Sequence, residues 1–290
     1  MREITRSLLK FLFGFIVVLI VSALLAPWLH TFLPFKFDRI LRRLIMIGTL
    51  LLVWGLVRSR RESLKELGLK RSSQGFVFLG KGFLFGLGLV VLLSLAQWYL
   101  GARFWQLSNK GGWHWIGYFF KAFGAGILIG AIEEFFFRGF MFFMLRELWN
   151  APASLMVTNL IYALVHFFPK GRVFVGTNPT MGDSFRILGS AVTPSTSTLL
   201  EMFPSMAGLF LFGLILSFLF LRTRTLYTSM GVHAGAIFAL KLNRRFLPEI
   251  SDKMNFLSGT KNLYDGIAGL AILAIVTFLT GLWARRRTAG

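Results

Sequence analysis

Long apolar runs of about 15 to 25 residues, separated by polar or basic segments, follow one another along nearly the whole chain. An α-helix needs about 20 apolar residues to cross the hydrocarbon core of a bilayer, so these runs have the length of membrane-spanning helices. The pattern therefore predicts an all-α protein, a polytopic transmembrane helix bundle with about eight spans. The predicted helices cover residues 8–27, 41–57, 76–100, 117–147, 151–168, 202–221, 225–241 and 266–284.

Three polar connections interrupt this pattern. Residues 58–75 are basic with interspersed leucines, which predicts a short amphipathic piece on a membrane surface. Residues 169–201 are expected to form a long polar loop, and residues 242–265 a second polar connection. The fourth predicted helix, 117–147, is longer than a bilayer requires.

The composition supports a membrane protein. Hydrophobic residues make up 55% of the 290 residues and charged residues 15%, whereas a soluble domain of this length carries more charge. The chain has no cysteine, which excludes disulfides, thiolate metal sites and cysteine nucleophiles. We expect an integral, multi-pass protein of a bacterial cell membrane.

The net charge of +20 comes largely from basic residues at the ends of apolar runs. Such positions match anionic lipid headgroups, so the lipid bilayer is the expected partner. A nucleic-acid-binding protein needs a contiguous basic face with residues that read bases, and no nucleic-acid partner is predicted. The clusters are Arg58, Arg60 and Arg61, then Arg222 and Arg224, and finally Arg285, Arg286 and Arg287.

Residues 130–140, GAIEEFFFRGF, place three charges inside an apolar helix. Each charge at a helix centre costs about 2.5–3.5 kcal/mol, so anchoring alone does not explain them. Glu134 and Arg138 are four residues apart, and on a helix they share a face and are expected to form an ion pair. Glu133 points about 100° away, so it needs other polar groups, a cavity or the bundle interior.

Two histidines offer such groups, because His166 and His233 also lie inside predicted apolar helices. Glu133, His166 and His233 have two main chemical uses. They are a possible ligand set for a divalent metal such as zinc with an open position for water. Alternatively, the carboxylate activates water as a general base and the imidazoles orient it or donate to an oxyanion. A purely structural role of buried pairs in packing is the third reading.

The order of these residues resembles a known family. E-E-x-x-x-R at 133–138, an aromatic residue four positions before His166 (here Tyr162) and His233 on a later helix are similar to the CAAX prenyl protease and bacteriocin-processing (CPBP, Abi) intramembrane endopeptidases. The resemblance covers about residues 117–241. It divides the chain into N-terminal helices with the basic segment (1–110), a catalytic helix core (111–245) and a C-terminal loop with the last helix (246–290).

The resemblance implies a function and a role for each matching residue. Glu133 would activate water for hydrolysis of a peptide bond in a membrane-associated protein or peptide. His166 and His233 would orient the water and stabilise the oxyanion, and Glu134 and Arg138 would support Glu133. The family resembles metal-independent proteases, so no cofactor is expected and a zinc-like metal is the second possibility.

One position departs from the family pattern. The third motif has Asn or Asp four residues after its histidine, where this chain has Ile237. Losing one oxyanion donor costs about 100- to 1,000-fold in rate. We hypothesise that Asn159 partly substitutes for it. A non-catalytic maturation or immunity factor on the same bundle is the main alternative function, and a proton-coupled transporter is a further one, although no repeat supports it.

Overall fold

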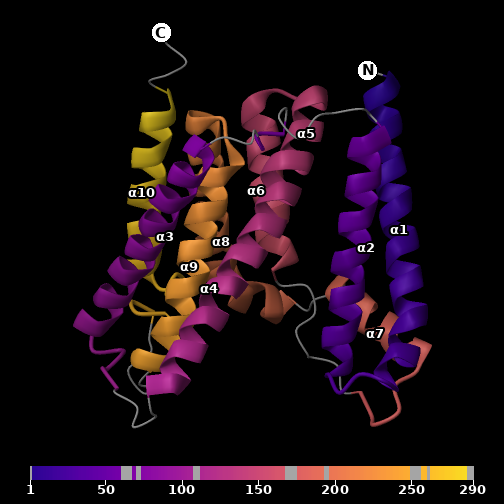
Figure 1. The fold of residues 1–290 in the computed structure, drawn as a ribbon, viewed down its shortest axis with the longest axis horizontal. Helices are drawn as coiled ribbons and strands as arrows, with labels where there is room; N and C mark the ends of the chain where they lie inside the picture. Colours follow the sequence, from indigo (N-terminus) through magenta and orange to yellow (C-terminus); the bar gives the residue numbers. More distant parts are fainter. Residues whose placement is uncertain are drawn as a thin grey trace. The chain divides into compact units, whose positions relative to one another are not determined.

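The structure, a computed structural model, describes residues 2–59, 67–69, 73–106, 112–166, 175–192, 196–248, 256–259 and 262–285. Its elements confirm the predicted all-α fold (Figure 1). They are α1 (Arg2–His30), α2 (Phe37–Ser59), α3 (Ser73–Tyr99), α4 (Gly112–Glu134), the π-helix η1 (Phe135–Met141), α5 (Phe142–Leu148), α6 (Ala151–Val165), α7 (Met181–Val192), α8 (Thr196–Thr223), α9 (Leu226–Phe246) and α10 (Ile267–Arg285).

Within the described residues, six helices are long and apolar enough to cross a membrane, fewer than the eight spans predicted. They are Arg6–His30, Phe37–Ser59, Ser73–Tyr99, Gly112–Leu148, Leu200–Thr223 and Ile267–Arg285. The other two predicted spans correspond to α6, which has only 15 residues, and to α9, which has Lys241, Arg244 and Arg245 in its second half. The six helices indicate a multi-pass integral membrane protein.

Two predicted connections differ from the structure or lie outside it. The segment 169–201 is not a continuous loop, since it contains α7 and the first residues of α8. Helix α7 is amphipathic and has only 12 residues. Its sequence therefore contains no long apolar run by which it could be predicted. The surface piece predicted over 58–75 falls mostly on residues 60–66 and 70–72, outside the described residues.

The chain forms two compact units. The first contains residues 1–63, 144–150 and 164–202, and in it α1 and α2 pack side by side with α7 against them (Figure 1). Gly14 of α1 accommodates Leu52 of α2, and Gly48 of α2 accommodates Val18 of α1. Ile187 anchors α7 in an apolar cluster with Ala26, Phe37, Ile40 and Leu41.

The start of α7 is fixed by a capping interaction. The main-chain N–H and the hydroxyl of Thr180 donate to the Asp183 carboxylate at 2.8 and 2.9 Å. These hydrogen bonds, first the one from the main chain, together with Arg186, lower the pKa of Asp183. These hydrogen bonds thus favour the ionised form of the capping carboxylate.

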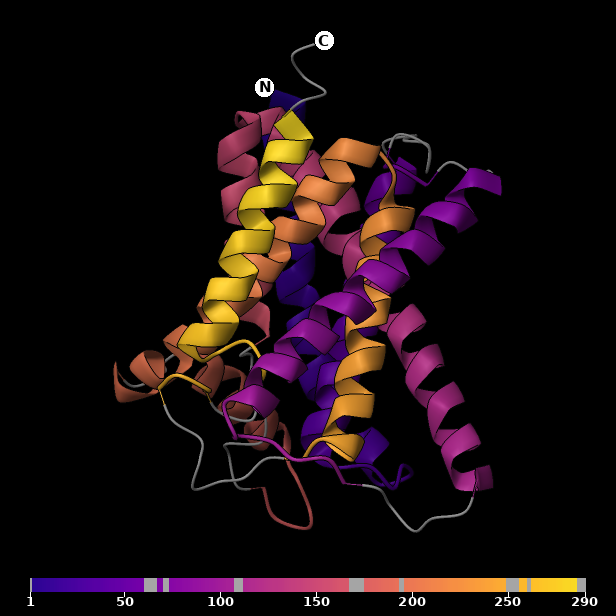
Figure 2. The ribbon, with the colours of Figure 1, turned by 90° about the vertical axis from the view of Figure 1, so that its left-hand side faces the viewer.

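The second unit contains residues 64–143, 151–163 and 203–290. Its central helix is α9, and α3 crosses it closely (Figure 2). The crossing depends on glycines from both helices. A methyl group on Gly86 would overlap the Val232 carbonyl oxygen, and one on Gly235 would overlap the Phe83 carbonyl oxygen. Gly82 and Gly231 make equivalent close approaches four residues earlier, so each helix contributes a small-xxx-small pair.

Helix α4 approaches α9 in the same way. A Cβ atom on Gly126 would lie 2.6 Å from the Ala234 carbonyl oxygen, and one on Gly130 would lie 2.9 Å from the Met230 carbonyl oxygen. Because Gly130 precedes Glu133 by three residues, this contact determines where along the α9 axis the two glutamates of α4 lie. The two glycine crossings thus fix the middle of α9, where His233 lies.

We expect Gly235→Ala to destabilise the protein by about 1–3 kcal/mol, because the methyl group meets backbone that has to shift. Thermal unfolding of the purified protein in detergent micelles measures the effect. The matched control is Gly80→Ala in α3, since a Cβ there meets nothing within 4 Å. This control should be neutral or stabilising by about 0.5–1 kcal/mol, as Ala favours the helix over Gly. Equal effects of the two variants would contradict the close crossing.

Candidate active site

The charged residues of GAIEEFFFRGF lie where the helix changes type. Glu133 and Glu134 are the last two residues of α4, and Arg138 lies inside the π-helix η1. Short π-helical insertions in α-helices are frequent at functional sites. The predicted ion pair is confirmed, because Arg138 Nη1 donates to Glu134 Oε1 at 2.9 Å.

Arg138 is almost completely buried, with 1% of its side chain exposed, and it binds three elements besides its own. Its Nη2 donates to Asn159 Oδ1 of α6 at 3.0 Å and to the Gly213 carbonyl oxygen of α8 at 2.9 Å. Its Nε lies 3.4 Å from Ser217 Oγ. These bonds, together with Glu134, compensate the cost of burying a charge and tie α6 and α8 to the end of α4.

The side chain of Asn159 belongs to the hydrogen-bond network around Arg138 and does not donate toward a substrate. Its Nδ2 donates to the Leu155 carbonyl oxygen at 2.8 Å and to Ser217 Oγ at 3.0 Å, while its Oδ1 accepts from Arg138. Both amide hydrogens thus have protein acceptors. The hypothesis that Asn159 replaces a missing oxyanion donor gains no support from this geometry, whereas its supporting position next to Arg138 is clear.

His233 connects the two adjacent glutamates. Its Nδ1 lies 2.9 Å from Glu134 Oε1, the oxygen that also accepts from Arg138, and its Nε2 lies 3.7 Å from Glu133 Oε2. A carboxylate has no hydrogen to donate, so the Nδ1 nitrogen carries the hydrogen of this bond. The bond orients the imidazole and turns Nε2 toward Glu133.

Glu133 and Glu134 have different surroundings although they are neighbours in sequence. The side chain of Glu134 is fully buried, whereas that of Glu133 is 26% exposed. The difference follows from the 100° rotation between successive residues of a helix. Glu134 binds Arg138 and His233 inside the protein. The Glu133 side chain is partly exposed, but its Oε2, the oxygen beside the imidazole, is buried.

Aromatic rings enclose this cluster. The rings of Phe212 and Tyr162 meet the imidazole of His233 edge-on, with centroids at 5.7 and 6.2 Å. The guanidinium of Arg138 lies 4.7 Å from the centre of the Tyr162 ring. Tyr162 therefore contacts both side chains that bind Glu134, the guanidinium of Arg138 and the imidazole of His233. This explains why an aromatic residue suits this position.

His166 follows the last residue of α6 and is half-buried. It belongs to the first compact unit, whereas Glu133, Glu134 and His233 belong to the second. Its participation in the site stays a prediction. Among the residues that the structure describes, no group of three His, Cys, Asp or Glu side chains is arranged to hold a metal ion. The use of a metal or of no cofactor likewise stays a prediction.

Ile237, the departure from the family pattern, is half-buried on α9 one turn after His233. Its side chain has no polar atom, so that turn of the helix supplies no side-chain hydrogen bond to a substrate. The two α8 residues that hold Arg138, Gly213 and Ser217, were not predicted. Their signal in the sequence was a small-xxx-small pair in an otherwise apolar run.

Comparison with known families agrees with this geometry. Residues 113–239 match the family described as Type II CAAX prenyl endopeptidase Rce1-like. No curated protein matches the chain. The matching segment contains every predicted site residue, from Glu133 to His233. The part of the chain that carries the candidate site therefore matches the Rce1-like type II CAAX prenyl endopeptidases, as its motifs predicted.

Proposed function

We propose that this protein is an intramembrane endopeptidase that hydrolyses a peptide bond in a membrane-associated protein or peptide, with Glu133 as the base that activates water. The observation that carries the proposal is the pair Glu133 and His233. Glu133, whose side chain is 26% exposed although its Oε2 is buried, places this oxygen 3.7 Å from Nε2 of His233, and Glu134 holds the other nitrogen of the imidazole ring. The match to an endopeptidase family over residues 113–239 supports it.

Glu133 Oε2 and His233 Nε2 lie 3.7 Å apart, a separation that two hydrogen bonds of about 2.8 Å to one water oxygen would span. Oε2 itself is buried, so neighbouring side chains have to move before this water can bind. In the proposed reaction, Glu133 takes a proton from this water while the water oxygen attacks the carbonyl carbon of the substrate. The proton then passes from Glu133 to the amine that leaves as the peptide bond breaks.

The remaining residues position this pair or stabilise charge. His233 Nε2 orients the water, and His166 is the proposed donor to the oxyanion, as the family resemblance implies. Glu134 holds the imidazole and accepts from Arg138, which fixes the end of α4 through α6 and α8. Glu134, Arg138 and Asn159 are thus positioning residues.

The proposal is tested by comparing newly formed protein termini in membranes of cells with wild-type protein and with Glu133→Gln. We expect cleavage products that are present in the wild type and absent in the variant, because glutamine cannot accept the proton. The matched control is Glu147→Gln, an exposed glutamate farther along the same continuous helix, which should leave the products unchanged. Identical termini in all three strains, at equal protein levels, would exclude the proposed activity.

The second candidate function, a non-catalytic maturation or immunity factor, is favoured by Ile237. It predicts that wild type and Glu133→Gln give the same termini. It also predicts that Ile237→Asn, which supplies the side chain of the family pattern, leads to cleavage products that the wild type does not form. Products from wild type that depend on Glu133 would exclude this candidate.

A further inference from the structure

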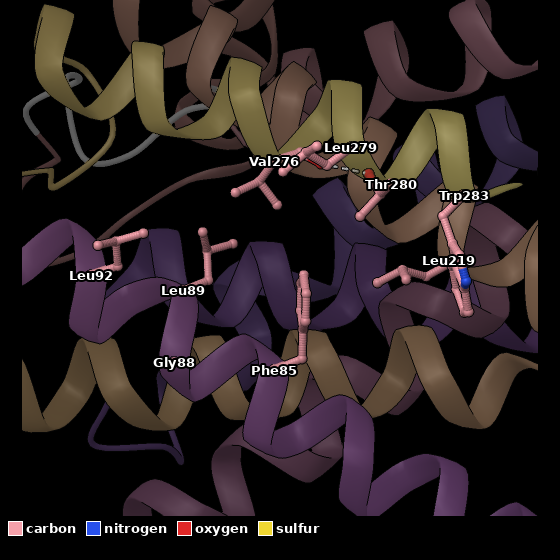
Figure 3. A pocket seen from close by; sticks show the side chains of 9 residues that line it. All are labelled: Phe85, Gly88, Leu89, Leu92, Leu219, Val276, Leu279, Thr280 and Trp283. Carbon is pink, nitrogen blue, oxygen red and sulfur yellow. Dashed lines mark hydrogen bonds between the residues drawn. The ribbon is translucent and has the colours of Figure 1, made fainter.

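An apolar groove of about 600 Å³ runs between α3 and α10, with Leu219 of α8 in its wall (Figure 3). All three helices belong to the second unit, and none of the lining residues takes part in the candidate active site. Both α3 and α10 are candidate membrane spans, and Phe85 and Leu279 at the groove are exposed. The groove therefore opens toward the hydrocarbon core of the bilayer.

Most of the atoms that line the groove are carbon atoms, and few are polar. The Thr280 hydroxyl donates to the Val276 carbonyl oxygen at 2.8 Å within α10, which leaves its methyl group for the groove. Gly88 contributes open space, since a Cβ there would meet nothing within 4 Å. The volume lies in the range of ligand sites, and the shape follows the two helices from Leu92 to Trp283 (Figure 3).

One end of the groove is cationic. The guanidinium carbon of Arg222 lies 4.8 Å from the centre of the Trp283 ring, and Arg222 follows the lining residue Leu219 by three positions on α8. Phe85 lies toward this same end (Figure 3), and the exposed Lys81 precedes it by one helical turn on the same face of α3. The opposite end, at Leu92 and Val276, is apolar.

This distribution matches an anionic amphiphile. Tryptophan and basic residues at helix ends are typical of the headgroup region, and basic residues there attract anionic lipids. A purely apolar ligand would make no use of the positive charge at this end, and a soluble anion would make no contact with the apolar lining. We propose that the groove is a binding site for one anionic glycerophospholipid of the bilayer, with an acyl chain between α3 and α10 and its phosphate at Arg222.

Native mass spectrometry of the purified full chain, after exchange into micelles that contain phosphatidylglycerol and phosphatidylcholine in equal amounts, tests the proposal. We expect one retained phospholipid on the wild type. Gly88→Leu should fill the groove and lose the lipid at least fivefold, because its side chain enters open space without disturbing the backbone. Gly80→Leu, at another open glycine of α3 outside the groove, is the matched control and should retain the lipid.

The headgroup is tested separately with Arg222→Gln. The wild type should retain phosphatidylglycerol in preference to phosphatidylcholine, and the variant should lose about fivefold of that preference, the typical effect of one basic residue near a membrane surface. Arg58→Gln is the matched control, since Arg58 lies 5.6 Å from the Trp54 ring on α2, in the first unit. It should leave the preference unchanged.

Three results would overturn the proposal. Equal retention of lipid by Gly88→Leu and Gly80→Leu would remove the groove as the site. Equal binding of both headgroups by the wild type would remove the anionic recognition. A retained isoprenoid or a dimer in place of a phospholipid adduct would identify a different occupant.

Discussion

Replacing Arg138 with leucine is expected to lower the free energy of unfolding by about 3–5 kcal/mol, one of the largest effects of a single substitution in this chain. The substitution leaves the fully buried Glu134 carboxylate without its cationic partner. It also leaves Asn159 Oδ1 and the Gly213 carbonyl oxygen without the Arg138 hydrogens. Unfolding of the purified protein in mixed micelles with increasing denaturing detergent, followed by tryptophan fluorescence, measures the change.

Two further variants separate the charge from the geometry. Arg138→Lys keeps the charge, but a lysine cannot bind α4, α6 and α8 at once. Its free energy of unfolding should therefore lie between those of the wild type and Arg138→Leu. Ser217→Ala removes the 3.4 Å contact to Arg138 and the 3.0 Å hydrogen bond from Asn159, and should cost about 1–2 kcal/mol. If Arg138→Leu were no less stable than Ser217→Ala, the buried network would not be what holds α6 and α8 to α4.

The positions of the long helices could be predicted because an apolar run has to match the thickness of a bilayer. The predicted helix 117–147 lies within the continuous run Gly112–Leu148, and 76–100 corresponds closely to α3. The predicted spans at 151–168 and 225–241 are less clear, because α6 has only 15 residues and α9 carries three basic residues in its second half. Helix α7 was missed because a short amphipathic helix has no long apolar run.

The local part of the site could also be predicted. Glu134 and Arg138 are four residues apart, and their ion pair forms even though Arg138 lies in a π-helix, since that spacing still brings both onto one side. The π-helix itself was not predicted, because Phe and Gly residues of this segment are compatible with either helix type. Its effect is to place Arg138 between α6 and α8.

The contact between His233 and Glu134 could not be predicted from spacing, since 99 residues separate them. It depends on where α4 and α9 cross, and glycines determine that crossing. The signal was present in the sequence as Gly126 with Gly130 of α4, a pair with GxxxG spacing that meets Met230 and Ala234 of α9, whereas Gly231 and Gly235 meet α3. Used as a crossing point, the α4 pair would have indicated that α4 and α9 meet next to His233.

Substitutions of the two adjacent glutamates are expected to have different effects, Glu133→Gln mainly on activity and Glu134→Gln mainly on stability. Glu133→Gln should change the free energy of unfolding by less than about 1 kcal/mol, because this side chain is 26% exposed and its contact to His233 is 3.7 Å. It should lower the cleavage rate by about 10²–10⁴-fold, the typical contribution of a general base. Glu134→Gln should instead cost about 3 kcal/mol of stability, because Arg138 then remains buried without a counter-charge.

Both quantities are measured on the same preparations, unfolding in detergent micelles and cleavage of a substrate identified from the membrane termini. Equal losses of stability for the two variants would show that Glu133 is as firmly built into the core as Glu134. In that case, a loss of cleavage in Glu133→Gln would follow from the damaged fold and would not identify Glu133 as the base.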